Sequence, residues 1–309
     1  MGGFVMENII LYDWLSFTYK TEDPLYIVSV LGLDHVPWET VKGARGYRDR
    51  LYFNCISIHF NGREDMGCWC EMSGQGCRAF ESLTSLPCKW DDLFQIISEE
   101  KMNITRVDLA FDDHTGVLDI NEIIQDTRKQ EFVSRSDYWE ILESSKGQSL
   151  QFGSPQSDVL IRIYDKARER NCAEGEHWIR CELQLRHDRA VKLAGLGLPI
   201  GQAFCGVVVN YLRFVDPDPL DSNRWRWPMK SYWGEMLCGA ERIRLYEAPG
   251  LDYNFDRCKK YVISQAGNAI DAYIQMRGVP GFLEDLENRP VHRNPKYDAL
   301  VSAYKSLSI

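Results

Sequence analysis

A tyrosine between two cations stands out in residues 158–166, DVLIRIYDK. Alternate residues of this segment are apolar, which is typical of a half-buried strand, and Arg162, Tyr164 and Lys166 fall together on its polar side. A phenol has a pKa of about 10 in water, and nearby positive charge favours the nucleophilic phenolate. The segment therefore predicts a tyrosine nucleophile assisted by two cations, with an ordinary surface strand as the alternative.

Two further segments repeat the alternation and carry carboxylates. Residues 106–112 read RVDLAFD and residues 180–186 read RCELQLR, with Asp108 and Glu182 near the middle of their polar sides. Oxygen ligands on rigid strands suit Mg²⁺ or Mn²⁺. If the three strands share a sheet, such a cation and the arginines could stabilise a phosphodiester while the tyrosine attacks it. Cross-strand salt bridges of small energetic value are the alternative.

Five ordered motifs resemble the replication initiation factors of rolling-circle plasmids and filamentous phages. They are DWLSFTY, EMSGQGCRAFE, ITRVDLAFDD, FGSPQSDVLIRIYDKARE and WIRCELQLR. The resemblance implies an enzyme that nicks one strand of its origin through a covalent 5′-phosphotyrosyl intermediate, with a divalent metal and frequently as a dimer. The family's tyrosine falls on Tyr164, followed by Lys166, and its acidic strand motifs fall on Asp108 and Glu182. Asp165 stands where the plasmid proteins often have Asn, on the opposite side of the strand.

The composition favours a globular cytoplasmic protein, and the resemblance implies a bacterial host. The chain has 309 residues, 44% of them hydrophobic, which suffices for one large domain or two modest ones. No apolar run approaches the roughly 18 residues of a membrane span, and the first residues lack the basic region of a signal peptide. The ten cysteines show no zinc-binding spacing, and because the sequence shows no secretion signal we expect reduced thiols.

The net charge of −9 argues against a general nucleic-acid coat, which is usually basic, but allows a site-specific nuclease with clustered cations. The clusters are residues 45–50 (RGYRDR), residues 162–170 with Lys166 and Arg168, Arg180 with Arg186, and residues 224–230 (RWRWPMK), where arginines alternate with tryptophans. Those tryptophans suit base stacking or ordinary packing equally well. The residues expected to bind DNA are Arg106, Arg180, Arg186, Arg224, Arg226 and Lys230.

The order of strand-like and helical segments predicts an α+β fold, with a curved antiparallel sheet, flanking helices and a mostly helical C-terminal part. We expect residues 1–215 to form the catalytic nicking domain. Residues 216–309 would be a linker followed by a helix over 253–277, with a role in DNA contact or dimerisation. The range 47–60 holds the longest strand-like run, LYFNCISIHF, before a turn at Asn61-Gly62, and 204–215 reads as either a strand or a helix.

Three rival classes differ in chemistry. A relaxase with a His-hydrophobic-His motif needs two histidines on one strand, whereas the six here are scattered and His59 stands alone. A tyrosine recombinase works without metal, and a non-catalytic origin-binding regulator needs no nucleophile. The resemblance implies origin DNA, single-stranded or cruciform at the nick, and a second copy of the chain as partners, with a host helicase as a further candidate. No membrane partner is expected. Whether Asp112 or Glu71 completes the metal site stays open.

Overall fold

The computed structural model describes residues 8–144, 147–173, 175–238, 259, 262–263 and 266–289. The chain divides into two compact units, Met1–Leu245 and Tyr246–Ile309. The sheet, its helices and the individual catalytic, metal-binding and DNA-binding residues named from the sequence belong to the first unit. In the second unit the structure describes the helix α10, Gly267–Glu287, which is kinked where Gly278 has a φ of 72°.

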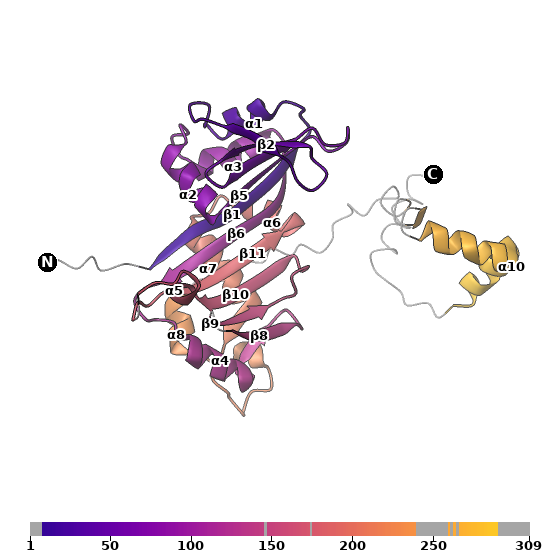
Figure 1. Ribbon diagram of the computed structural model, residues 1–309. Coiled ribbons are helices and arrows are strands. Elements are labelled where there is room, and N and C mark those ends of the chain that lie inside the picture. Colours follow the sequence, from indigo (N-terminus) through magenta and orange to yellow (C-terminus); the bar gives the residue numbers. More distant parts are fainter. Residues whose placement is uncertain are drawn as a thin grey trace. The chain divides into compact units, whose positions relative to one another are not determined.

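A ten-stranded antiparallel sheet runs through the first unit (Figure 1). Its order is β2-β3-β4-β5-β1-β6-β11-β10-β9-β8, so the two longest strands, β1 and β6, lie at its centre. A separate two-stranded sheet joins β7 to β12. The strands are β1 Ile9–Tyr19, β2 Glu39–Lys42, β3 Asp49–Phe53, β4 Ile56–Phe60, β5 Cys68–Ser73, β6 Asn103–Asp113, β7 Phe132–Ser134, β8 Trp139–Ser144, β9 Gly147–Phe152, β10 Val159–Asp165, β11 Ile179–Arg186 and β12 Leu212–Phe214.

Helices cover the apolar face of the sheet (Figure 1). Ile161, Leu183 and Leu109 lie side by side on β10, β11 and β6 and are buried on this face, because strand alternation sends their polar neighbours to the other side. The α+β fold predicted from the sequence is therefore confirmed. The helices of this unit are α1 Pro24–Val30, α2 Gly74–Leu83, α3 Trp90–Glu99, α4 Ile120–Arg128, α5 Lys166–Glu169, α6 His187–Ala194, α7 Ile200–Tyr211, α8 Ser231–Met236 and the short 3₁₀ helix η1 Arg224–Arg226.

Three segments differ from the sequence interpretation or complete it. The run 47–60 is a hairpin, because Asn54 and Cys55 adopt φ angles of 40° and 64° and turn the chain between β3 and β4. Residues 204–215 form most of α7 and then β12. The first half of the helix expected over 253–277 lies mostly outside the described residues.

The boundary between the units also lies elsewhere than expected. Residues 216–230 were read as a linker, yet the chain divides after Leu245. The reason is α8, which follows that segment: its Trp233 is fully buried, and the indole lies 4.9 Å from the ring of Phe214. Residues beyond 215 therefore help to build the core of the first unit.

No helix in the described part of the chain is both long and apolar enough to cross a membrane.

Candidate active site on the polar face of the sheet

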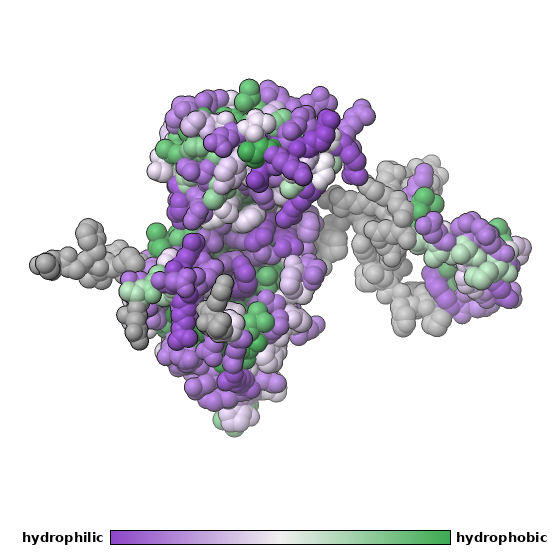
Figure 2. Space-filling view, viewed as in Figure 1, coloured by the Kyte–Doolittle hydropathy of each residue, from purple (hydrophilic) through white to green (hydrophobic). Residues whose placement is uncertain are grey.

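The three strands singled out by their polar residues are neighbours, in the order β6, β11, β10. Arg162 lies opposite Glu182, and Gln184 lies opposite Asp108. Hydrophilic residues dominate the middle of the first unit on the side seen in Figure 2. The side chains expected to converge do share one face of one sheet.

The Tyr164 hydroxyl lies between a carboxylate and a cation. It donates a hydrogen bond to Glu182 Oε2 at 3.1 Å, and Lys166 Nζ donates one to the phenolic oxygen at 3.4 Å. Arg162 forms an ion pair with the other carboxylate oxygen of Glu182. The tyrosine side chain is half-buried. Its hydroxyl contacts polar groups and is not enclosed by aliphatic side chains.

Lys166 reaches the phenol from a different element than expected. The strand β10 ends at Asp165, and Lys166 is the first residue of α5. The Asp165 carboxylate accepts a hydrogen bond from the backbone N–H of Arg168 at 2.9 Å and so caps this helical turn. Lys166 also pairs with Glu169 at 2.5 Å, which leaves its ammonium group shared between a carboxylate and the phenol.

The environment of Tyr164 raises its pKa above the ordinary value of 10.0. Burial has the largest effect, and the negative charge of Glu182 acts in the same direction, whereas Arg180 and Arg162 lower the pKa. The sequence interpretation expected the nearby cations to lower the pKa of Tyr164, and that expectation was wrong for the protein without substrate. Burial and one hydrogen-bonded carboxylate outweigh the two guanidinium groups.

Two buried carboxylates and a carboxamide form the candidate cation site. Asp108 and Glu182 lie on adjacent strands, and the amide nitrogen of Gln184 has no hydrogen-bond partner among the described residues. Arg106 holds Asp108 through Nε at 2.8 Å and Nη2 at 2.5 Å. Burial nevertheless raises the pKa of Asp108 to about 7; Arg106 lowers it, and the charge of Glu182 raises it further. A buried carboxylate in this condition would gain from a hard cation.

Neither residue left open as a further metal ligand lies in this group. Asp112 accepts two hydrogen bonds from Arg180, at 2.6 and 2.7 Å. Glu71 belongs to β5, on the far side of β1 and β6 from Glu182. Across the described residues, no cluster of three or more His, Cys, Asp or Glu side chains is arranged to hold a metal. The oxygen donors available are thus those of Asp108, Glu182 and Gln184.

The arginines expected to bind DNA on these strands differ in accessibility. Arg180 is buried, and besides its pair with Asp112 it reaches Asp13 at 2.8 Å, so it serves as a structural bridge. Arg186 is partly exposed, and its Nε has no hydrogen-bond partner among the described residues. Arg106 is partly exposed and lies over the indole of Trp14 at 4.5 Å.

The cations of the segment 224–230 are engaged by the protein. Arg224 donates to the backbone carbonyl of Phe132 at 2.9 Å, and Arg226 pairs with Asp221 at 2.6 Å. Lys230 is largely buried and lies 2.7 Å from Glu131. Their contribution to DNA binding stays a prediction, and these contacts give each of them a role in packing.

Sequence reasoning missed Gln184 and Trp14. Gln184 occupies the same polar side of RCELQLR as Glu182, so its spacing could have signalled it. Trp14 lies opposite Asp108 on β1. It belongs to the DWLSFTY motif, but nothing in its local pattern indicates that β1 would join β6.

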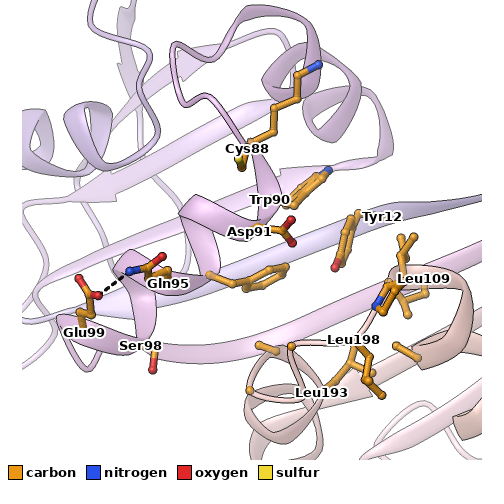
Figure 3. A pocket seen from close by; sticks show the side chains of 18 of the residues that line it. Tyr12, Cys88, Trp90, Asp91, Gln95, Ser98, Glu99, Leu109, Leu193 and Leu198 are labelled. Carbon is orange, nitrogen blue, oxygen red and sulfur yellow. Dashed lines mark hydrogen bonds between the residues drawn. The ribbon is translucent and has the colours of Figure 1, made fainter.

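A cavity of about 1090 Å³ opens on the helix-covered side of the sheet (Figure 3). Trp90 and Phe94 of α3, Leu193 of α6 and Leu198 line it, together with Tyr12 from β1. None of the residues predicted to act in catalysis is among the described residues that line it. The candidate chemistry therefore lies on the opposite face of the sheet.

Comparisons with known proteins match nearly the whole first unit. A family model described as "Replication initiation factor" matches residues 102–284, and one described as "Rolling Circle replication initiation protein N-terminal domain" matches residues 9–96. The chain is 31% identical over 271 residues to "Putative DNA relaxase NicK" of Bacillus subtilis (strain 168), covering 79% of this chain and 75% of that protein. It resembles the solved structure of a rolling circle replication initiator protein from Geobacillus stearothermophilus, with a TM-score of 0.70 and 32% identity, over 78% of this chain and 99% of the other.

Proposed function

The chain belongs to the replication initiation factor family, and from this premise we propose that it nicks one strand of its origin DNA through Tyr164. The observation that carries the proposal is the phenolic hydroxyl at 3.1 Å from Glu182 and 3.4 Å from Lys166 on the polar face of the sheet. A phenol with a proton acceptor and a cation within reach is the arrangement that a nucleophile requires.

Tyr164 Oη attacks the phosphorus of the scissile phosphodiester, and its proton passes to Glu182 Oε2. The P–O3′ bond breaks, and the leaving 3′ oxygen takes a proton from solvent. The new bond joins the 5′ phosphate to Tyr164 and conserves the energy of the phosphodiester for a later strand-joining step. Lys166 stabilises the negative charge as it develops on the phenolic oxygen, and Arg162 keeps the Glu182 carboxylate in place.

A divalent cation, Mg²⁺ or Mn²⁺, completes this proposal. Asp108 and Glu182 would hold it, with the Gln184 carboxamide as a neighbouring oxygen donor; hard oxygen ligands fit these ions. When bound, the cation supplies Lewis-acid polarisation of the phosphodiester and offsets the Glu182 charge that raises the pKa of the phenol. The ion pairs of the two carboxylates with Arg106 and Arg162 would have to be shared with it or opened.

The substrate in this proposal is origin DNA whose nick site is exposed as a single strand or a cruciform. A second copy of the chain could supply a second tyrosine for strand transfer, and a host helicase would separate the strands. The place of action would be the bacterial cytoplasm. Arg106 and Arg186 are partly exposed cations on the polar face, and in this proposal they contact phosphates.

Replacing the nucleophile tests the proposal directly. Tyr164→Phe should abolish nicking of a supercoiled plasmid that carries the origin, with a loss of more than about a thousandfold, because phenylalanine has no oxygen to attack phosphorus. The control is Tyr138→Phe, since Tyr138 is exposed and also donates to a carboxylate, at 2.7 Å from Glu140.

Mass spectrometry of the wild-type protein trapped on DNA should place the adduct on the peptide that contains Tyr164. If Tyr164→Phe nicks at the wild-type rate, Tyr164 is not the nucleophile. If the wild-type protein binds the origin and never nicks it with Mg²⁺ or Mn²⁺ present, the non-catalytic alternative holds.

A further inference from the structure

The two halves of the sheet repeat one arrangement around its centre. From the centre outward, one half has the order β1-β5-β4-β3-β2 and the other has the order β6-β11-β10-β9-β8. In each half the central strand comes first in the chain, and the other four strands follow outward in reverse chain order. Helices α2 and α3 follow β5 in the chain, just as α6 and α7 follow β11. The two family models also divide the chain between these halves.

Strand register shows which residue stands where the nucleophile does in the other half. Tyr164 lies opposite Arg180 on β11, two residues from Glu182; His59 lies opposite Trp69 on β5, two residues from Glu71. His59 is therefore the counterpart of Tyr164, and Glu71 is the counterpart of Glu182. The proximity is repeated without the hydrogen bond, since His59 Nε2 lies 3.5 Å from Glu71 Oε1 and has no hydrogen-bond partner among the described residues.

In the N-terminal half, the region around His59 and Glu71 forms a pocket and not a reaction centre. His59 is 1% exposed and lies beneath Trp69, with ring centroids 4.7 Å apart, so it cannot meet a substrate. A cavity of about 440 Å³ opens above it on the polar face. That volume lies in the range of roughly 300–1,000 Å³ that small-ligand sites occupy.

Aromatic rings and arginines line this pocket together. Trp14, Tyr47 and Trp69 supply the rings, and Arg45, Arg106 and Arg186 supply the cations, against the single carboxylate of Glu71. The guanidinium group of Arg45 lies over Trp69 at 5.0 Å, and that of Arg106 lies over Trp14 at 4.5 Å. Planar guanidinium groups and aromatic rings are the surfaces on which unpaired bases stack.

Two donors of the pocket have no hydrogen-bond partner among the described residues. They are Trp14 Nε1 and Arg186 Nε, both buried as atoms although their side chains are partly exposed. Buried N–H groups normally have a partner, and each of these two would be stabilised by an acceptor that a small side-chain shift brings within reach. An uncharged ring with acceptor atoms and a phosphate attached matches this combination of rings, donors and cations.

We propose that this pocket binds an unpaired base of the same DNA strand whose phosphodiester faces Tyr164. The inference rests on the proposed function for the identity of that strand. Strand spacing and rise place Glu71 roughly 20 Å from Glu182 along the same face, which is a distance of several nucleotides. The N-terminal half thus holds the strand while the C-terminal half cuts it, and Arg106 lies between the two sites.

The experiment measures how much the bases themselves contribute to binding. The probes are a fluorescent thymidine oligonucleotide of about twelve units, within the usual site sizes of roughly 4–16 nucleotides, and an abasic sugar-phosphate chain of the same length and charge. Binding is measured by anisotropy with full-length Tyr164→Phe protein, so that no chemistry intervenes. We expect this protein to bind the thymidine probe about tenfold more tightly than the abasic probe, because stacking one base is worth about 1–3 kcal/mol.

Two substitutions should reduce that preference several-fold. Trp69→Ala removes the ring that supports the stacking surface. Arg45→Lys keeps the charge of an exposed side chain but removes its plane, so affinity for the abasic probe should stay the same. Arg63→Lys is the control, because Arg63 is an exposed arginine that pairs with Asp65 and does not line the pocket.

Equal affinity of the unsubstituted pocket for both probes would overturn the inference, and so would an unchanged preference in both variants. A loss of affinity by Trp69→Ala for both probes alike would also count against it, since that points to charge or folding. Because only binding is measured, the result stands apart from the nicking test: a Tyr164→Phe protein that still nicks would refute the proposed nucleophile and leave this comparison readable.

Discussion

Charged side chains on the polar face are buried by one another instead of by a covering layer of helices. Asp108, Asp112, Arg180 and Glu182 are all at most 5% exposed, yet each has an ion pair with a neighbouring strand or residue. Such groups are expensive to desolvate, and removing one partner leaves the other uncompensated. The side chains are therefore held rigidly where each buried charge has a partner of opposite charge. Stability depends on pH where the partner does not fully offset the burial of a carboxylate, as at Asp108.

The raised pKa of Asp108 predicts a pH dependence of stability. In the folded chain without divalent cation its pKa is about 7, against an ordinary value of 3.8, chiefly because it is buried. The folded state thus holds this proton more tightly than the unfolded state. The stabilisation from this group is fully present below pH 3.8 and is lost as pH rises through about 7.

Denaturant unfolding in the presence of a chelator, at about pH 5 and about pH 8, measures this effect. Asp108→Asn should lack this contribution to the pH dependence of the unfolding free energy, because an amide cannot ionise. The free energy of unfolding of the wild type should therefore fall more between the two pH values than that of the variant. Equal falls would show that Asp108 does not titrate in this range.

At the scale of the elements, the position of Tyr164 depends on the turn that leads from β9 into β10. Gly153 has a φ of 107°, and a Cβ at this position would lie 2.5 Å from the backbone oxygen of Val159. Only glycine combines this backbone conformation with so close an approach. The turn brings β10 back beside β9, in the register that places Arg162 opposite Gln151 and Tyr164 opposite Ser149. The other edge of β10 then pairs with β11.

Substituting this glycine should destabilise the fold more than substituting one in open space. Gly153→Ala adds a clash with backbone to the conformational strain, and we expect a loss of more than roughly 2 kcal/mol. Gly116→Ala is the matched control, because Gly116 has a φ of 86° with no atom within 4 Å of the added Cβ, so strain of about 1 kcal/mol remains. Thermal unfolding of the two variants gives the comparison, and equal losses would mean that the close approach does not matter.

At the scale of the whole chain, the first unit includes the helix α8, although the sequence pattern before this helix did not indicate that it belongs to the same domain. Trp233 donates to the backbone oxygen of Leu212 at 3.2 Å, and Tyr232 donates to Asp126 at 3.0 Å. The helix α8 thereby closes the core beside β12 and α4. The prolines and charges of residues 216–230 suggested a linker, whereas the segment is a loop that returns the chain to the same core.

Truncation tests where the first unit ends. A chain ending at Leu245 should unfold cooperatively near the temperature of the full-length protein, because it keeps α8. A chain ending at Val215 loses the buried Trp233, and replacing such a side chain by alanine typically costs about 3–5 kcal/mol, so it should melt much lower or fail to fold. Circular dichroism during heating distinguishes the two, and equal melting temperatures would favour the earlier boundary.

The sequence by itself determined the strands that carry the candidate site residues and the side that each of these residues takes. Alternation in RVDLAFD, DVLIRIYDK and RCELQLR separates most polar residues from apolar ones, since a strand has a period of two wherever it lies. That was enough to group Tyr164 with Asp108 and Glu182, and ordered motifs were enough to indicate the family. It was not enough to place Lys166, which lies one residue beyond the strand.

Only the tertiary structure decided which strands are neighbours and how deeply their charges are buried. Burial and the charge of Glu182 raise the pKa of Tyr164, although its neighbours along the chain are cations, because desolvation depends on atoms brought from distant segments. The pairing of β1 with β6 likewise joins Trp14 to Asp108 and sets the pocket around Trp69 on the face that carries Tyr164. Local patterns carry no information on such pairings, since register between distant strands is fixed by the packing of the whole sheet.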